Sequence, residues 1–216
     1  MKFHIITIFP EAFTSFLETS IIGKAREKWL LDMQLHKLNE YAKDTSGHVD
    51  DKAYGMHGQV LSPIPLSRAI EAIFQNIWKK IPVIFMTPSG QTLGQEMVEN
   101  FAENSDEYII ICGHYEGIDQ RIIELYVDYE ISLWDYILTG WELPAQILID
   151  SIVRLKTGVL WNEISCKEES FSEKLERKKE YPVYTRPQEF MGKNVPEILL
   201  SGNHSKIELW KKNNLR

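Results

Sequence analysis

The sequence predicts an α/β fold with a largely parallel sheet, followed by a small α-helical unit. Short apolar runs alternate with segments of helical periodicity, which is typical of parallel strands joined by helices. After residue 160 the apolar runs stop and the sequence becomes polar and irregular. We therefore expect an α/β domain over residues 1–160, a linker over residues 161–172 and a small helical domain over residues 173–216.

The predicted strands share a short apolar run bounded by polar residues. They cover residues 3–9, 31–38, 82–86 and 108–112, and the segment 131–138 is of mixed character. Thr87–Gly90 has the composition of a turn. Residues 39–62 are polar and aperiodic, so they are predicted to form a long loop, and loops of that length are usually functional or disordered.

The predicted helices carry apolar residues on one face. Leu66, Ile70, Ile73 and Ile77 show this spacing most clearly. The predicted helices lie near residues 21–28, 66–77, 96–102, 120–125, 143–155, 171–178 and 205–212.

Composition indicates a soluble, cytoplasmic protein with no membrane partner. The two cysteines are too few for a disulfide framework, which favours a reducing compartment. The sequence shows no signal peptide and no apolar stretch near the roughly 18 residues needed to cross a bilayer.

Charge is divided unevenly along the chain, whose net charge is −7. Residues 173–216 carry 10 Lys and Arg against 6 Asp and Glu, whereas the first 172 residues carry 14 against 25. A basic C-terminal part can dock a polyanion even when the rest of the molecule is acidic. A solvated basic surface is an equally good interpretation of the charge alone.

Three glycine-containing loops follow predicted strands, at the edge where parallel α/β sheets bind ligands. They are Thr87–Gly90, Gly113–Asp119 and Ser132–Pro144. None is a dinucleotide-binding fingerprint, a P-loop or a metal-ligand cluster. The residues alone therefore indicate an α/β enzyme with a three-loop site.

The second and third of these loops resemble the cofactor loops of the bacterial tRNA (guanine-N1) methyltransferases, a family of the SPOUT class. The resemblance is collinear and covers almost the whole chain. Trp134 and Trp141 stand where the family usually has glycine, and His114 stands where it usually has arginine, so the chain looks like a divergent member. The other matching segments are Thr7–Pro10, Val49–Asp51, Tyr54–Gly55, Leu148–Ser151 with Arg154, Gly158–Leu160, Tyr184–Pro187, Val195–Pro196 and Leu199–His204.

The resemblance implies a deep trefoil knot in the C-terminal part of the α/β domain. Knots are so rare that no periodicity could indicate one. It also implies a homodimer with the active site at the subunit interface, and a helical domain that contacts tRNA and is shortened here. The implied reaction is methyl transfer from S-adenosylmethionine to N1 of the guanosine 3′-adjacent to the anticodon, position 37 of tRNA. Mg²⁺ is expected for turnover, without assigned protein ligands.

Site residues follow from the resemblance by position. Asp50, Tyr54 and Gly55 would bind the substrate. Arg154 matches the family's substrate arginine, and Glu169 falls where most members have the aspartate that acts as base. The residues that would bind the donor, with the backbone of 133–138 holding the adenine, are Phe85, Met86, Gly113, Tyr115, Glu116, Leu133, Trp134, Asp135, Tyr136, Ile137, Leu138, Gly140 and Pro144.

These residue types fit the implied chemistry. Guanine N1 carries a proton at neutral pH, so a carboxylate must remove it as the methyl group moves. A positioned base is typically worth roughly 10²–10⁴-fold in rate. Arg154 would stabilise the negative charge that grows toward the guanine O6. Glu168 is the alternative to Glu169 as the base.

Two other functions stay open on the sequence alone. Trp134, Trp141 and the short C-terminal part motivate a catalytically weakened paralogue that binds RNA or a protein partner. The second alternative is a knotted methyltransferase that acts on a different RNA. Binding of S-adenosylmethionine would separate the first alternative from the enzyme, and methylation of tRNA with and without the target guanosine would separate the second.

Overall fold

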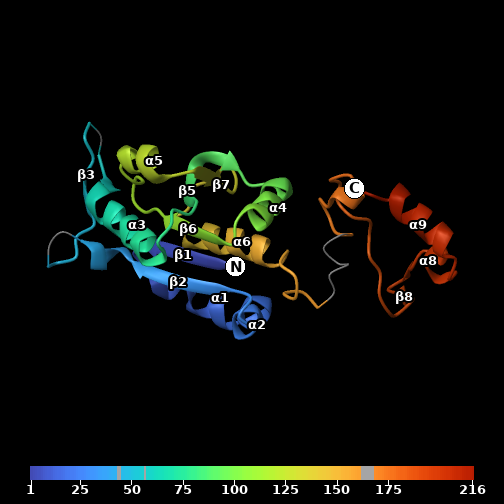
Figure 1. Ribbon diagram of the computed structural model, residues 1–216. Helices are drawn as coiled ribbons and strands as arrows, with labels where there is room; N and C mark the ends of the chain where they lie inside the picture. The colour runs from blue at the N-terminus through green and yellow to red at the C-terminus, as the bar shows by residue number, and fades with distance from the viewer. Residues whose placement is uncertain (43–44, 56, 162–167) are drawn as a thin grey trace. The chain divides into compact units, whose positions relative to one another are not determined.

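The computed structural model describes residues 1–216 apart from 43–44, 56 and 162–167. The chain divides into two compact units, Met1–Leu160 and Trp161–Arg216 (Figure 1). Of the helices described, none has the length and apolar character needed to cross a membrane.

A five-stranded sheet forms the centre of the first unit (Figure 1). Every pair of neighbouring strands is parallel. This confirms the predicted α/β fold with a largely parallel sheet. In spatial order the strands are β2 (Asp32–Lys37), β1 (Lys2–Thr7), β6 (Glu107–Cys112), β5 (Val83–Thr92) and β7 (Tyr129–Ser132).

Helices cover both faces of the sheet, because the strands are apolar on both. Successive side chains of a strand point to opposite faces. In β6, Tyr108 and Ile110 therefore pack in one apolar cluster, whereas Ile109 and Ile111 pack in the other. The first cluster includes η1 (Pro10–Phe13), α1 (Thr14–Glu18), α2 (Ser20–Glu27), α4 (Gln95–Asn104) and α6 (Glu142–Val153). The second includes η2 (Leu38–Tyr41), α3 (Pro63–Ile77) and α5 (Gln120–Tyr126).

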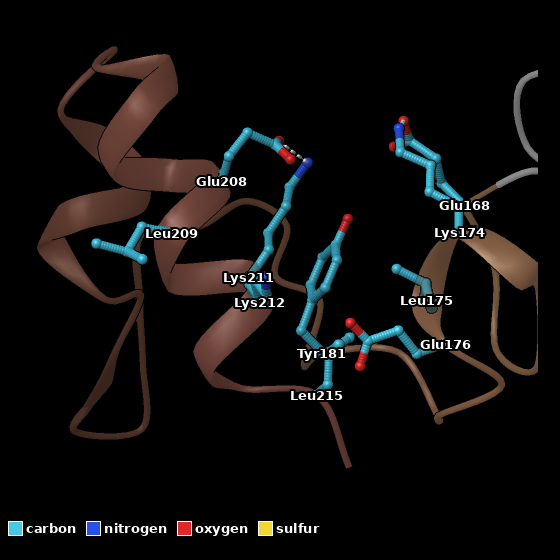
Figure 2. Close-up of a pocket in the computed structure, with 10 residues that line it drawn as sticks. All are labelled: Glu168, Lys174, Leu175, Glu176, Tyr181, Glu208, Leu209, Lys211, Lys212 and Leu215. Atoms are coloured by element: carbon cyan, nitrogen blue, oxygen red, sulfur yellow. Dashed lines mark hydrogen bonds and ion pairs between the residues drawn. The ribbon is translucent and has the colours of Figure 1, made fainter.

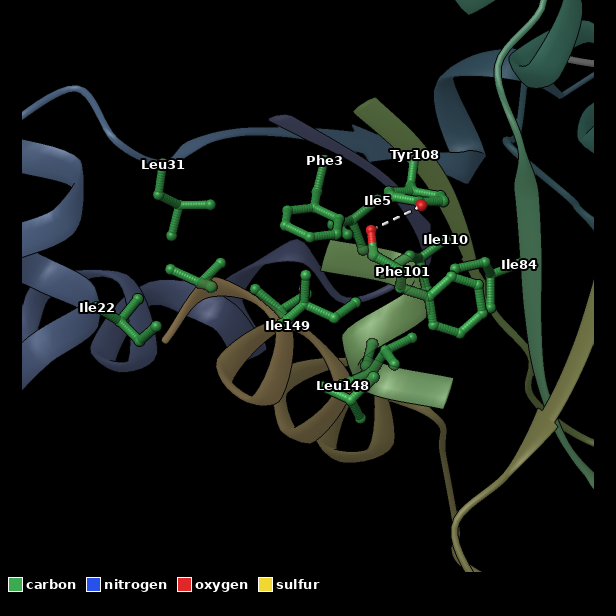
Figure 3. Packing of buried hydrophobic residues seen from close by; sticks show 14 of the residues in the cluster. Phe3, Ile5, Ile22, Leu31, Ile84, Phe101, Tyr108, Ile110, Leu148 and Ile149 are labelled. Atoms are coloured by element: carbon green, nitrogen blue, oxygen red, sulfur yellow. Dashed lines mark hydrogen bonds between the residues drawn. The ribbon is translucent and has the colours of Figure 1, made fainter. Parts of the chain in front are cut away.

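Figure 3 shows the first cluster, in which α6 packs on the sheet through Leu148 and Ile149, near Phe3 of β1. The one polar atom drawn from β6 is satisfied, because Tyr108 Oη donates to the Phe101 carbonyl at 2.9 Å. A buried hydroxyl without such a partner would be costly. The apolar packing fixes α6, and with it the loop that leads into this helix.

The described residues of the segment 39–62 form more regular structure than predicted. It contains η2 and an antiparallel hairpin made of β3 (Asp50–Lys52) and β4 (Gln59–Leu61). The prediction of one long loop was wrong here, because strands of only three residues are too short to show a usable alternation.

The predicted turn at Thr87–Gly90 was also wrong, because these residues belong to β5. The strand pairs with β7 in two registers, since Ile131 lies opposite both Met86 and Gln91. The residues between bulge out of the ladder, which explains their turn-like composition. Gly90 is required here: a Cβ at this position would lie 2.4 Å from the backbone carbon of Glu130.

The second unit is small and mostly helical or irregular. The helix predicted near 171–178 was wrong: only a short 3₁₀ turn forms, because Glu176 and Arg177 have φ of +55° and +61°. The helix predicted near 205–212 is confirmed as α9, whose first turn is capped by the Asn203 side chain accepting from Lys206 N. The elements are η3 (Glu173–Leu175), β8 (Glu189–Phe190), β9 (Lys193–Asn194), α8 (Glu197–Leu200) and α9 (His204–Asn213).

Candidate active site

Two of the three predicted loops leave the carboxyl edge of the sheet. The loop 113–119 joins β6 to α5, and the loop 133–141 joins β7 to α6. Ligands of parallel α/β folds bind at this edge. The third predicted loop, 87–90, is part of β5 instead, so Phe85 and Met86 lie in a buried strand rather than before a turn.

A buried hydrogen-bond cluster joins these loops to the end of β1. The Glu142 carboxylate accepts from Thr7 Oγ1 at 2.6 Å. It also lies 2.8 Å and 2.9 Å, through its two oxygens, from His114 Nε2. Thr7 Oγ1 in turn accepts from Phe9 N at 2.9 Å. Since a carboxylate can only accept, His114 carries its proton on Nε2.

Glycines let the two loops approach this cluster closely. A Cβ on Gly140 would lie 2.5 Å from Cε1 of His114 and 2.7 Å from Oε2 of Glu142. A Cβ on Gly113 would lie 3.0 Å from the Phe85 ring. Both glycines were predicted to bind the donor, and this role stays a prediction. A side chain at either position would have to displace these neighbours.

The loop 133–141 holds its own shape through its backbone. The Trp134 carbonyl accepts from Ser132 Oγ at 3.2 Å and from Tyr136 N at 2.9 Å. The side chains of Trp134, Tyr136 and Ile137 are 63%, 48% and 76% exposed. Asp135 is exposed as well, and Leu138 is half-buried.

The two tryptophans that replace the usual glycines occupy different environments. The Trp134 indole is exposed, whereas Trp141 packs against the first apolar cluster together with Leu133. Trp141 Cδ1 lies 3.7 Å from where a Gly113 Cβ would stand. Pro144 is buried in the first turn of α6.

The β3–β4 hairpin is attached to the loop 113–119. Glu116 N donates to the Gln59 carbonyl at 3.0 Å, and Leu61 N donates to the Gly117 carbonyl at 3.0 Å. Gly58, with φ of +105°, passes so close that a Cβ there would lie 2.6 Å from Glu116 Cγ. These contacts fix the hairpin that carries Asp50 beside Glu116. Asp50 was predicted to bind the substrate, whereas Glu116 was predicted to bind the donor.

The other predicted substrate residues lie near the tip of this hairpin. Tyr54 is fully exposed, and Gly55 has a φ of +76°, which favours glycine. Tyr115, at φ +58° and 56% exposed, also faces solvent, next to the His114 ring at 6.3 Å between centroids.

Arg154 and Glu169 belong to different compact units. Arg154 caps the end of α6, with its backbone N donating to the Asp150 carbonyl. Glu169 is half-buried in the second unit, where its carbonyl accepts from Ser172 N at 3.1 Å. Residues 162–167, which precede it, lie outside the described part of the chain. The assigned roles of Arg154 and Glu169 stay predictions.

Glu168, the alternative base, lines a cavity of about 400 Å³ between η3 and α9 (Figure 2). Its carboxylate accepts a hydrogen bond from Lys174 Nζ, and this bond lowers the pKa of Glu168. Tyr181 stands in the same cavity, with Lys211 Nζ 5.2 Å from its ring centroid.

Among the residues that the structure describes, no group of three or more His, Cys, Asp and Glu is arranged to hold a metal ion.

Comparison with known proteins agrees with this geometry. The family model described as tRNA (Guanine-1)-methyltransferase TrmD matches residues 1–216. The chain belongs to this methyltransferase family. Among its curated relatives, the tRNA (guanine-N(1)-)-methyltransferase of Brevibacillus brevis is 48% identical over 212 residues, which is 98% of this chain and 85% of the relative. The protein of that name from Lachnospira eligens is 46% identical, over 98% of this chain and 88% of the relative.

A solved structure supports the same assignment. The crystal structure of tRNA (m1G37) methyltransferase from Aquifex aeolicus matches this methyltransferase with a TM-score of 0.79 and 38% sequence identity. The match covers 98% of this chain and 88% of the Aquifex chain.

Sequence reasoning missed Thr7 and Glu142 as site residues. Both lie within segments that carried the resemblance, but nothing local marks them as partners, since 135 positions separate them. Gly58 was missed for the same reason, because only the folded hairpin brings it against Glu116.

Proposed function

We propose that this methyltransferase transfers a methyl group from S-adenosylmethionine to N1 of the guanosine at position 37 of tRNA. The observation that carries the proposal is the family match over residues 1–216, together with two glycine-containing loops at the carboxyl edge of a parallel sheet. The Aquifex methyltransferase is named for the same nucleotide, m1G37. A tRNA substrate implies that the enzyme works in the cytoplasm.

The donor would lie against the loops 113–117 and 133–141. The backbone of 133–138 would hold the adenine, and Tyr115 and Glu116 would face the donor from the other loop. The exposure of Trp134 supports this arrangement, because an indole that faces solvent leaves the loop backbone accessible to the adenine. Mg²⁺, which the reaction is expected to need, would be held mainly by RNA oxygens and water, as this ion usually keeps several waters.

The catalytic step needs a base and a group that stabilises negative charge. S-adenosylmethionine, when bound, supplies an electrophilic methyl carbon on a sulfonium that is already a good leaving group. Glu169 would take the N1 proton of guanine, and Arg154 would stabilise the charge on O6. Glu169 is preferred to Glu168 because it falls at the position where most members of the family have the aspartate that acts as base.

The proposed enzyme is a knotted homodimer. Leu143 and Ile147 support the dimer: they are 63% and 49% exposed, one turn apart on the outer face of α6. Exposed apolar side chains grouped on one face often mark an interface. The basic residues of 173–216 support a tRNA-contacting role for the second unit.

The test is methylation of a tRNA transcript that carries either guanosine or adenosine at position 37, with donor binding measured by calorimetry. We expect product only from the guanosine transcript. Glu169→Gln should lower kcat by about 10²–10⁴-fold with little change in donor affinity, whereas Glu168→Gln should stay within a few-fold of the parent.

Three results would each contradict part of the proposal. Folded protein that binds no donor would instead favour the weakened paralogue. Equal methylation of both transcripts would favour a different RNA target, and a fully active Glu169→Gln variant would remove the proposed base.

A further inference from the structure

The carboxylate of Glu142 is buried, yet no Lys or Arg of the described part of the chain pairs with it. Only 6% of this residue is exposed. Burying a carboxylate is costly unless it is hydrogen-bonded. Here the compensation comes from Thr7 at 2.6 Å and from His114 at 2.8 Å and 2.9 Å. An apolar residue would avoid this desolvation, so packing alone gives no reason for a carboxylate at the start of α6.

The partners of Glu142 come from three different segments. Thr7 ends β1, His114 lies two residues beyond β6, and Glu142 follows the loop that leaves β7. The separations in sequence are 135 residues to Thr7 and 28 residues to His114. One carboxylate thus joins the carboxyl ends of strands that have no covalent connection nearby.

The cluster also determines where the loop backbones lie. Gly140 passes so close to the His114 ring and to a Glu142 oxygen that a Cβ at this position would collide with both. The His114 ring packs edge-on against Phe9, with centroids 5.1 Å apart, and lies 6.3 Å from the Tyr115 ring. Residues on either side of the cluster, 113–116 and 133–140, are those proposed to line the donor site.

We propose that Glu142 is a positioning residue of the donor site, acting through His114 and Thr7. Glu142 holds the loops 113–117 and 133–141 at the spacing in which both can contact the donor. This inference rests on the proposed function and deepens it. The carboxylate itself does not touch the donor, so it contributes by keeping the backbone in place.

The test separates positioning from general folding by measuring two affinities. In Glu142→Gln, a neutral amide replaces the carboxylate that accepts hydrogen bonds from Thr7 and His114. We expect donor affinity, measured by calorimetry with S-adenosylmethionine on the full chain, to fall about 10–100-fold, since the loops would lose the charged acceptor that holds them together. Affinity for tRNA, measured without donor, should stay within about threefold. The control is Glu124→Gln, at an exposed carboxylate of α5, which should change neither.

Variants at His114 provide an independent test if Glu142→Gln does not fold. His114→Ala should weaken donor binding in the same way, and His114→Arg should restore it to within about threefold, because arginine again offers N–H donors to the carboxylate. A folded Glu142→Gln protein with parental donor affinity would overturn the inference, as would an equal loss of donor and tRNA affinity. An arginine variant no better than alanine would also overturn it. Failure of the parent protein to bind donor would instead refute the proposed function.

Discussion

Nδ1 of His4 lies 3.1 Å from Nε2 of His36, and the two rings stack with centroids 5.3 Å apart. The chain of contacts continues at both ends, from His4 Nε2 to Glu107 Oε1 at 3.2 Å and from His36 Nδ1 to Tyr41 Oη at 3.1 Å. His4 Nε2 donates to the carboxylate, so His36 Nε2 donates to His4 Nδ1 and Tyr41 donates to His36. Both rings are neutral in this arrangement.

Acid should therefore destabilise the first unit through these histidines. Burial lowers the pKa of His4, and it lowers the pKa of His36 to about 4, helped by the nearby His4 and Lys2. Their contribution is complete above the unfolded pKa of about 6.5 and is lost as the pH falls toward 4, because only the unfolded chain then takes up the protons. Glu107, Lys79 and Asp32 also face the cluster.

The check is urea unfolding at several pH values between about 7 and 4. We expect His36→Gln to remove about 1–2 kcal/mol of the parent's acid-dependent loss, an amount reduced for solvent screening because His36 is only partly buried. Parallel stability curves for the parent and the variant would contradict this.

Gly90→Ala should destabilise the first unit by about 2–3 kcal/mol. The added Cβ would stand 2.4 Å from the Glu130 backbone carbon and 2.5 Å from Ile131 N, so strand β7 itself would have to move. Gly94→Ala is the matched control, because no atom lies within 4 Å of its Cβ and its φ is −126°. Chemical denaturation measures the stability of both variants. Equal midpoints of unfolding would contradict the prediction, because they would show that β7 can shift at little cost.

Gly58→Ala should lower the rate of methylation by more than its modest loss of stability would explain. The left-handed backbone at φ +105° costs alanine about 1–2 kcal/mol. The new Cβ would also displace the Glu116 side chain, which is 2.6 Å away at Cγ, from its place in the proposed donor site. We expect kcat/KM to fall about 10–100-fold. Gly192→Ala, at φ +75° with open space around it, should show the strain alone, and similar kinetics in the two variants would argue against a role for Glu116.

The two indoles should respond differently to truncation. Trp134→Ala should leave stability within about 0.5 kcal/mol and donor affinity nearly unchanged. Trp134 contributes to the loop's hydrogen bonds through its carbonyl, which alanine also has, and its indole is exposed. Trp141→Ala should cost about 2–4 kcal/mol, since this ring packs on the core. Thermal unfolding and donor titration test both, and a large gain in donor affinity for Trp134→Ala would mean that its indole obstructs the site.

Leu143→Glu should dissociate the proposed homodimer. A charge in the middle of a self-complementary apolar face appears twice in a symmetric dimer, so the penalty is doubled. Leu125→Glu, which alters a side chain 73% exposed on α5, is the control. Light scattering should give a monomer for the first variant and a dimer for the second, and a dimer in both would place the interface elsewhere.

Much of the fold could be predicted because it follows from periodicity. β6 alternates between two buried clusters, and α3 presents Leu66, Ile70 and Ile73 to one of them, so both elements are visible in the sequence. The hairpin β3–β4 could not be predicted in this way. Its strands have three residues each, too few to show a periodicity, and their backbone bonds to the loop 113–119 join segments that are far apart in the sequence.

The loops of the candidate site could be predicted from the sequence, but the side-chain contacts between them could not. Glycine-containing turns after β6 and β7 indicated where a ligand would bind. The contact between Thr7 and Glu142 depends on strand order, which places β1 directly beside β6. Nothing in the spacing of these residues indicates that order, so their role could be found only once the sheet was known.

The bond between Thr7 and Glu142 has a consequence for synthesis on the ribosome. The first strand emerges early, but its threonine meets no carboxylate until more than half of the polypeptide has been translated. A nascent chain that stops before α6 therefore lacks the carboxylate that we propose holds the two glycine-containing loops in place, so the proposed donor site should form late during elongation.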